Sequence, residues 1–436
     1  MTIVRALPRF REAYRALDVL AARERWSRAE VESYQLERLN ATWRHAVAQV
    51  PHYRDLAIRR RLPKRFSDLA EFRRVVPVLS KSAVQQRPGW FLSEQAPRGR
   101  WRHTSGSTGF RTVVFWGDDA YRQSLRAKYR LLSSWGVDIF DRSVMFWGDG
   151  AVGLGPLAGT FVRARRSVED RLRRRLRLEA HGLGPDRLRS HLRRIERFRP
   201  VAIYAYSTAA YMLAREALAS GFRCESLKVV ILTSEMALPH MVETVERALG
   251  VPAVQEYGSV ECGFLAGEDP ARTLKVREDL VLLETCPRSD GRFDIIATVL
   301  NNPAFPLLRY AVGDTTSTAV APVEEGFAAL TEIIGRHNDL LVSRRGDQVH
   351  PTFVCHLLED LPGVTRFRAR QRAGGAVHIL VEVKGASSSI NVAKLRDRLQ
   401  KVIGFQVHIE LVSDLPSMPS GKHRWIVSEL AALAVS

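Results

Sequence analysis

One short segment of the chain concentrates groups that can bind phosphate. Four hydroxyl side chains and two glycines occur in six consecutive residues, and Arg111 follows two positions later. Backbone N–H groups and hydroxyls in such a loop can surround phosphate oxygens, and the arginine can supply positive charge. No Gly-Lys-Ser/Thr sequence follows, so this is not a Walker A loop, and an ordinary Ser/Gly turn is the alternative. The six loop residues are Thr104, Ser105, Gly106, Ser107, Thr108 and Gly109.

A second candidate site combines an aromatic ring with carboxylates. The sequence Glu256-Tyr257-Gly258-Ser259-Val260-Glu261 follows an apolar run at 251–254, and α/β proteins bind ligands where strands end. Tyr257 could lie against a purine ring, and Glu261 could hold Mg²⁺, which prefers carboxylate oxygen. Further along, Asp314 follows a glycine, and a carboxylate at such a turn can accept two hydrogen bonds from a ribose diol. Taken alone, each of these residues is more often part of a surface turn.

Near the C-terminus, a loop presents a single lysine. Residues 415–422 contain two prolines and a glycine before Lys422. A lysine delivered by a mobile domain can neutralise charge that develops between a carboxylate and a phosphate. The polar segment 335–339, with Asn338 and Asp339, lies where such a domain would begin and can serve as its hinge. An exposed loop lysine and a simple linker are the alternatives.

The remaining pattern predicts the elements that must position these residues. After a largely helical first hundred residues, buried strands (144–147, 201–205 and 229–233) alternate with helices (185–199, 211–220 and 239–249), as in an α/β sheet covered on both faces. Strands at 280–284 and 293–300 indicate a β-rich subdomain. Strands at 340–343, 377–383 and 407–412 and a helix at 391–402 follow. We therefore predict a large N-terminal α/β domain with a β-rich subdomain (1–336) and a small, mobile α+β C-terminal domain (337–436).

Composition narrows the functional classes. The 436-residue chain carries a formal net charge of +19, and fourteen arginines against five acidic residues lie between Arg163 and Arg199. That segment is either a solvated face or a surface that attracts polyanions. No helix-turn-helix, zinc-finger or RNA-reading signature accompanies it, so specific nucleic-acid binding is not expected. No apolar run approaches the ~18 residues of a membrane span. Four cysteines without a CxxC pair favour a reducing, cytoplasmic setting.

In order and spacing, these segments resemble the core motifs of the adenylate-forming superfamily, which includes acyl- and aryl-CoA ligases, luciferase-type enzymes and peptide-synthetase adenylation domains. The matching segments are 105–109, 257–261, 310–314, 335–339 and 420–422. Within the superfamily, the chain looks most like the phenylacetate–CoA ligase branch and its CapK-type relatives in capsular polysaccharide biosynthesis. Three short elements carry this closer resemblance: Val50-Pro51-His52-Tyr53-Arg54, Pro77-Val78-Leu79-Ser80-Lys81 and Arg345-Gly346-Asp347-Gln348-Val349-His350-Pro351.

The resemblance implies a role for each matching residue. The loop Thr104–Gly109 would cradle the ATP phosphates, the segment with Ser234 and Glu235 would line the adenine and acyl pocket, and Tyr257 would flank the adenine. Glu261 would bind Mg²⁺, and Asp314 would hold the ribose hydroxyls with help from Arg336. Lys422 would bridge the carboxylate and the α-phosphate. The C-terminal domain would then swing about Asn338 or Asp339 for thiol attack.

The sequence also departs from the family pattern and leaves the function open. Phe110-Arg111 stands where relatives often have Lys-Pro, and Val260 replaces a common hydroxyl residue. No zinc is expected, because the Cys and His ligands of some relatives are missing. The leading hypothesis is a carboxylate–CoA ligase that uses ATP, Mg²⁺ and CoA. One alternative transfers the acyl group to a carrier protein, amine or hydroxyl, and another is a non-catalytic polyanion-binding scaffold.

Overall fold

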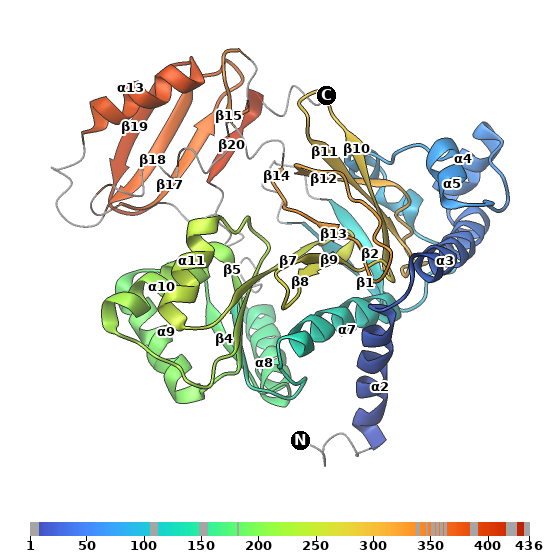
Figure 1. Cartoon of the computed structure of the whole chain (residues 1–436), viewed down its shortest axis with the longest axis horizontal. Helices are drawn as coiled ribbons and strands as arrows, with labels where there is room; N and C mark the ends of the chain where they lie inside the picture. The colour runs from blue at the N-terminus through green and yellow to red at the C-terminus, as the bar shows by residue number, and fades with distance from the viewer. Residues whose placement is uncertain are drawn as a thin grey trace. The chain divides into compact units, whose positions relative to one another are not determined.

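The computed structural model describes residues 8–104, 112–147, 156–180, 183–336, 341–345, 348–349, 354, 357, 361, 364–383, 391–415 and 425–430. The chain divides into two compact units. The first comprises Met1–Glu179 and Leu183–Ile334, and the second comprises Ala180–Gly182 and Gly335–Ser436 (Figure 1). The boundary that we predict after residue 336 lies two residues further along.

The N-terminal segment of the first unit is helical. Its elements are α2 (Pro8–Arg23), α3 (Arg28–Gln49), α4 (Pro51–Arg60), α5 (Leu69–Val75), α6 (Lys81–Gln86) and a 3₁₀ turn (Pro88–Phe91). Ser27 begins α3 through a capping box, in which its hydroxyl accepts from the Glu30 N–H and the Glu30 carboxylate accepts from the Ser27 N–H. Trp43, Tyr53 and Phe72 are almost fully buried in a core that these helices share with strand residues such as Val281, Ile295 and Tyr310.

A large sheet forms the body of the first unit. Its strands run in the order β13-β9-β8-β7-β6-β5-β3-β4, and β7, β6, β5, β3 and β4 are parallel neighbours. Helices α9, α10 and α11 cover one face, and α7 and α8 cover the other (Figure 1). The strands are β3 (Ser143–Trp147), β4 (Arg175–Glu179), β5 (Ala202–Tyr206), β6 (Val229–Thr233), β7 (Ala253–Ser259), β8 (Gly263–Glu268), β9 (Leu274–Val276) and β13 (Ala329–Leu330). The helices are α7 (Asp118–Ser134), α8 (Pro156–Leu172), α9 (Pro185–Phe198), α10 (Ser207–Ser220) and α11 (Pro239–Leu249).

Two smaller sheets complete the first unit. One contains β10, β11 and β12 in that order, and the short strand β14 (Gly335–Arg336), where the second unit begins, follows β12 in its strand order. The other is the two-stranded sheet of β1 (Gly99–His103) and β2 (Val113–Gly117), which pair in antiparallel register. The remaining strands are β10 (Val281–Pro287), β11 (Phe293–Val299) and β12 (Tyr310–Thr316), and they form the predicted β-rich subdomain.

The second unit is a small α+β domain. Its main sheet has the order β19-β18-β17-β20, with β18 (Val377–Val383) antiparallel to β17 and parallel to β19. Helix α13 (Val392–Ile403) connects β18 to β19 and buries Leu395, Leu399 and Ile403. The other strands are β15 (Leu341–Val342), β16 (Gln348–Val349), β17 (Val364–Gln371), β19 (Val407–Val412) and β20 (Ile426–Ser428).

Two arginine-rich strands were missing from the expectations. Strand β4, with the sequence RLRLE, lies within the basic segment between α8 and α9. Strand β17, with the sequence VTRFRARQ, alternates exposed or half-buried arginines with the buried Phe367 and Ala369. Arg366 of β17 pairs across the sheet with Glu382 at 2.7 Å. The period of two that marks a strand is therefore present, but arginine stands on its outer face.

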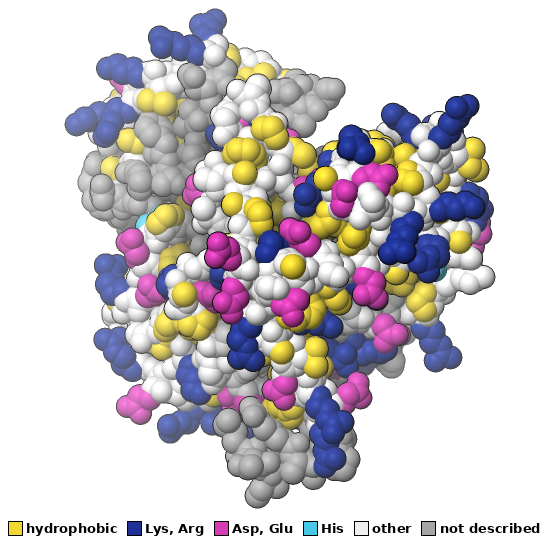
Figure 2. Space-filling model, turned by 45° about the vertical axis from the view of Figure 1, so that its right-hand side comes forward, with side chains coloured by type: hydrophobic (Ala, Val, Ile, Leu, Met, Phe, Trp, Pro, Cys, Tyr) yellow, Lys and Arg dark blue, Asp and Glu magenta, His cyan; other side chains and the backbone are white. Residues whose placement is uncertain are grey.

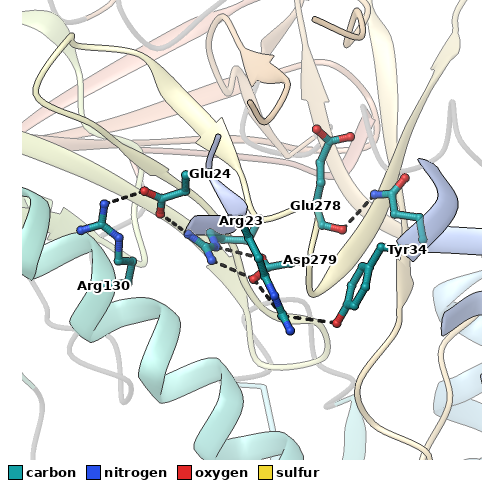
Figure 3. A network of polar contacts seen from close by, with 8 residues as sticks. Arg23, Glu24, Tyr34, Arg130, Glu278 and Asp279 are labelled. Atoms are coloured by element: carbon teal, nitrogen blue, oxygen red, sulfur yellow. Dashed lines mark hydrogen bonds and ion pairs between the residues drawn. The ribbon is translucent and has the colours of Figure 1, made fainter. Parts of the chain in front are cut away.

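A network of buried and half-buried charges connects the turn between α2 and α3 to the large sheet (Figure 3). The Asp279 side chain is fully buried and accepts two hydrogen bonds from the Arg277 guanidinium, from Nε at 3.1 Å and from Nη2 at 2.9 Å. Arg277 also donates to Glu24, whose carboxylate lies 2.6 Å from Nη2 of Arg130 on α7. Arg23 approaches Asp279 at 3.5 Å. The N-terminal helices are thus tied by charge to the loop between β9 and β10.

The charged surface is mixed rather than one-sided on the face that Figure 2 shows. Basic side chains lie among acidic ones over most of that face. The basic segment between Arg163 and Arg199 forms the end of α8, strand β4 and helix α9, and α9 buries Leu188, Leu192 and Ile195 against the sheet. Within the described part of the chain, no helix is long and apolar enough to cross a membrane.

We predict that Asp279→Ala lowers the free energy of unfolding of the first unit by about 3–5 kcal/mol, because it removes the bidentate partner of a buried guanidinium. Urea unfolding followed by tryptophan fluorescence measures this loss, since seven of the eight tryptophans precede Gly335. Asp290→Ala is the matched control: Asp290 pairs with Arg288 in a turn, where such pairs contribute less than about 1 kcal/mol. Equal losses in the two variants would contradict the prediction.

Candidate functional site

The carboxyl ends of β6 and β7 lie side by side, because these strands are parallel neighbours with Thr233 opposite Glu256. Ser234 follows β6 and is exposed, with a φ of 68°. This left-handed conformation costs a residue with a side chain roughly 1 kcal/mol or more, so the surrounding structure must impose it. The sheet therefore brings the segments around Ser234 and Tyr257 to one edge, where ligands of parallel sheets bind.

Glu235 holds the start of helix α10 in place. Its carboxylate accepts a hydrogen bond from the Thr208 N–H at 2.9 Å, and its backbone carbonyl accepts one from the Ser207 hydroxyl at 3.2 Å. These contacts satisfy groups in the first turn of α10, where a negative charge is favourable. Glu235 thus fixes the start of α10 relative to the end of β6.

Tyr257 and Asp314 meet although 57 residues separate them in sequence. The Tyr257 hydroxyl donates to the Asp314 carboxylate at 2.9 Å. Asp314 reaches this position through a bulge in β12: Asp294 pairs with Thr315 and Ile296 with Ala311, so residues 312–314 stand opposite one residue of β11. Gly313 at the centre of the bulge has a φ of 89°, which glycine adopts readily. The half-buried carboxylate and the tyrosine ring are therefore held together at one place.

Glu261 is nearly buried and is paired with a lysine from the N-terminal helices. Its side chain is 2% exposed, and its Oε1 lies 2.7 Å from Nζ of Lys81. The Tyr310 hydroxyl donates to the same oxygen at 3.3 Å. One carboxylate is chemically suited to Mg²⁺, which commonly takes one or two protein carboxylates and completes its shell with phosphate and water. The residues present therefore fit a Mg²⁺–nucleotide, provided that the cation shares Glu261 with Lys81.

The neighbouring thiol of Cys262 is buried. Burial, reinforced by the negative charge of Glu261, raises the pKa of Cys262, and its backbone N–H donates to the Ser259 hydroxyl at 2.9 Å. A buried thiol with a raised pKa stays protonated at neutral pH. Across the described residues, no group of three or more His, Cys, Asp or Glu side chains is arranged to hold a metal ion.

Thr104 and Thr112, at the two ends of the predicted phosphate loop, are hydrogen-bonded to each other, and we call this pair the neck of the loop. The Thr104 N–H donates to the Thr112 carbonyl at 3.0 Å, and the Thr112 N–H donates to the Thr104 hydroxyl at 3.0 Å. Both threonines are buried. The ends of the loop are thus fixed where β1 gives way to β2.

Glu256, just before Tyr257, is also held by charge. Its Oε1 lies 2.8 Å from Nζ of Lys128 on α7, and the Tyr204 hydroxyl donates to its other carboxylate oxygen. Lys128 also donates to the Tyr204 hydroxyl at 2.9 Å. Contacts with α7 and β5 therefore hold β7 at the residue just before Tyr257.

The structure places some predicted site residues and leaves others outside the described residues. Thr104, Ser234, Glu235, Tyr257, Gly258, Glu261 and Asp314 are described. At Gly258, an added Cβ would collide with the Gly263 carbonyl oxygen, so the close approach of β7 to β8 requires glycine there. The residues outside are Ser105, Gly106, Ser107, Thr108, Gly109, Arg111, Asn338, Asp339 and Lys422; of Arg336, only the backbone in β14 is described.

Two residues at this site had no role in the sequence analysis. Lys81 and Tyr310 both contact Glu261, and both lie in segments that matched the family pattern. The matched segments signalled their importance, but nothing in sequence spacing indicates that a lysine 180 residues upstream of Glu261 reaches its carboxylate.

Comparison with known proteins identifies the relatives of this chain. Residues 341–429 match the family model of the CapK C-terminal domain. Protein CapK of Staphylococcus aureus is 22% identical over 369 residues, which cover 81% of this chain and 80% of the relative. A phenylacetate–coenzyme A ligase of Aromatoleum evansii is 26% identical over 367 residues, which cover 77% of each chain.

Solved structures agree at the level of the fold. 2-Hydroxyisobutyryl-CoA ligase in the postadenylation state, in complex with 2-HIB-AMP, matches with a TM-score of 0.72 and 18% identity over 95% of this chain and 93% of that protein. The same ligase with 2-HIB-AMP and CoA in its thioesterification state matches with a TM-score of 0.60 and 19% identity over the same shares. The chain is therefore a relative of CapK and the phenylacetate–CoA ligases, and it has the fold of the adenylate-forming CoA ligases.

Proposed function

We propose that this protein uses ATP to convert a carboxylic acid into its acyl-adenylate and then transfers the acyl group to CoA. The observation that carries the proposal is the hydrogen bond between Tyr257 and Asp314, which joins two predicted nucleotide-binding segments at the end of a parallel sheet. The likeness to phenylacetate–CoA ligases over most of the chain supports the same chemistry.

In this proposal, the described residues form the nucleoside half of the site. Tyr257 flanks the adenine while its hydroxyl holds Asp314, and Asp314 accepts hydrogen bonds from the ribose hydroxyls, with Arg336 assisting. Glu261 binds Mg²⁺, which when bound would neutralise part of the phosphate charge. Ser234 and Glu235 line the nucleotide and acyl side of the same edge.

The transfer requires two substitutions. In the first, a carboxylate oxygen of the acid attacks the α-phosphorus of ATP, and pyrophosphate leaves with the electrons of the broken P–O bond. The loop Thr104–Gly109 and Arg111 hold the phosphates, and Lys422 brings the two anions together by screening their repulsion. In the second, the CoA thiolate attacks the acyl carbon, and AMP leaves. The domain of residues 337–436 turns about Asn338 or Asp339 between the two steps.

A second candidate changes only the acceptor. Residues 341–429 match the model of the CapK C-terminal domain, and Protein CapK aligns over 81% of this chain. The acyl group would then pass to a carrier protein, an amine or a hydroxyl rather than to CoA. The cytoplasmic location stays a prediction under both candidates.

We predict that Lys422→Ala lowers the rate of acid-dependent ATP–pyrophosphate exchange about 10²–10³-fold, because one preorganised charge at the reacting phosphate is lost. The assay screens aryl, fatty and amino acids with the full chain. Lys401→Ala, which removes an exposed lysine from the same domain, is the control and is expected to match the wild type. Unchanged exchange in Lys422→Ala would contradict the proposed role.

Asp314→Ala is expected to remove discrimination between ATP and 2′-deoxy-ATP. In the wild type the carboxylate can bond to both ribose hydroxyls, and loss of one such bond to a charged group weakens binding by about 1.5–3 kcal/mol. The ratio of kcat/KM for the two nucleotides measures the effect. Tyr257→Phe, which keeps the ring, should lower the same ratio less. A ratio that stays at the wild-type value in Asp314→Ala argues against the ribose contact.

The acceptor is tested by product analysis. With CoA as acceptor, adding CoA and the activated acid should yield the acyl-CoA thioester and AMP in equal amounts, while pyrophosphate exchange proceeds without CoA. Mass spectrometry of the products measures the amounts of the thioester and of AMP. Exchange that gives no thioester with CoA would favour the second candidate.

A further inference from the structure

We propose that Lys81 and Gln85, on the single helix α6, are positioning residues of the nucleotide site: Lys81 supports Glu261, and Gln85 fixes the neck of the phosphate loop. This inference rests on the proposed function, and it assigns a role to helix α6, which has none among the residue roles that the resemblance implies. Three independent contacts support it.

The first contact is the ion pair at the start of α6. Nζ of Lys81 lies 2.7 Å from Oε1 of Glu261, and the Lys81 side chain is 29% exposed while that of Glu261 is 2% exposed. A nearly buried carboxylate is costly unless a cation or hydrogen-bond donors compensate it. Lys81 therefore compensates Glu261 with a cation while keeping one side open to solvent.

The second contact is at the other end of the helix. Nε2 of Gln85 donates to the Thr112 hydroxyl at 3.0 Å. Thr112 is fully buried and exchanges two hydrogen bonds with Thr104 across the neck of the loop. Gln85 thus links the base of the phosphate loop to the helix that also holds Glu261.

The third contact joins the approach to α6 with the strand that carries Asp314. The Leu79 N–H donates to the Arg309 carbonyl at 2.8 Å, and the Ala311 N–H donates to the Leu79 carbonyl at 2.9 Å. Leu79 is therefore a bridge partner of Tyr310, the residue whose hydroxyl also reaches Glu261. The short segment from Leu79 to Gln85 therefore contacts Glu261, Thr112 in the loop neck and strand β12, which carries Asp314.

Charge balance gives this arrangement a measurable signature. Without Lys81, the negative charge of Glu261 would repel the phosphates of ATP unless another cation neutralised it. Mg²⁺ could supply that charge, so loss of Lys81 should weaken nucleotide binding mainly when the metal is absent. A helix that served only as a structural support would not produce a metal-dependent effect.

The experiment on Lys81 measures binding of ATP to the full chain by calorimetry, with Mg²⁺ and with a chelator. Lys81→Met is expected to weaken binding about tenfold in the chelator and clearly less with saturating Mg²⁺. Lys81→Arg keeps the charge and should recover most of the affinity. Lys64→Met, which removes an exposed lysine from the same unit, should bind as the wild type does. If Lys81→Met does not fold, Lys81→Met with Glu261→Gln removes both charges and should bind ATP equally with and without metal.

The experiment on Gln85 uses its exposed neighbour as the control. Gln85→Leu is expected to weaken ATP binding several-fold in both conditions, because the hydrogen bond that holds the Thr112 hydroxyl beside Thr104 is lost. Gln86→Leu should have no effect. Thr112→Val removes the same hydrogen bond from its other side, so the double variant with Gln85→Leu should lose less than the sum of the two single losses.

The outcomes separate this inference from the proposed function. Wild-type exchange together with normal ATP binding by Lys81→Met and Gln85→Leu overturns the inference and leaves the adenylation intact. The expected losses of binding, in a protein that catalyses no exchange with any acid, support the positioning roles and overturn the adenylation. A wild type that binds no ATP in either condition overturns both.

Discussion

The site depends on compensating one nearly buried carboxylate. Glu261 follows β7, and its side chain is only 2% exposed, so its charge must be balanced from within the protein. The balancing ammonium comes from Lys81, in a helical segment that precedes the sheet by more than sixty residues in sequence. Helix α6 therefore contributes a charge to the candidate site, although the N-terminal helices contribute no strand to the large sheet.

The same principle recurs away from the site. Glu256 on β7 is balanced by Lys128 on α7, and the Arg277–Asp279 pair in the loop between β9 and β10 contacts Arg23 and Glu24 at the turn between α2 and α3. Each set of contacts holds one element against another, because breaking it would leave a buried charge without its partner. In a chain with many more arginines than lysines, such pairs give charge a structural role as well as a role in solubility.

Sequence patterns predicted the alternating strands and helices well, because apolar runs such as Val229–Thr233 are buried on both faces and end at clear turns. Strands β4 and β17 were missed because arginine occupies their outer positions, and the outer face of a strand imposes no hydrophobic requirement. Tyr257, Glu261 and Asp314 were identified from motifs. The Tyr257–Asp314 bond could not be, because it depends on a bulge whose register only the folded sheet defines. Likewise, Glu235 caps α10, a role that follows from three-dimensional proximity and not from its neighbours in sequence.

The bulge in β12 has one further consequence. The pairing of β11 with β12 is regular on both sides of residues 312–314, so the extra backbone is confined to one point and the strand resumes its alternation beyond it. Residues in this short excursion can change, or the excursion can lengthen, without moving side chains elsewhere in the strand to the opposite face. Evolution can thus change the direction of the Asp314 carboxylate within this short segment while the pairing of the rest of β12 is kept.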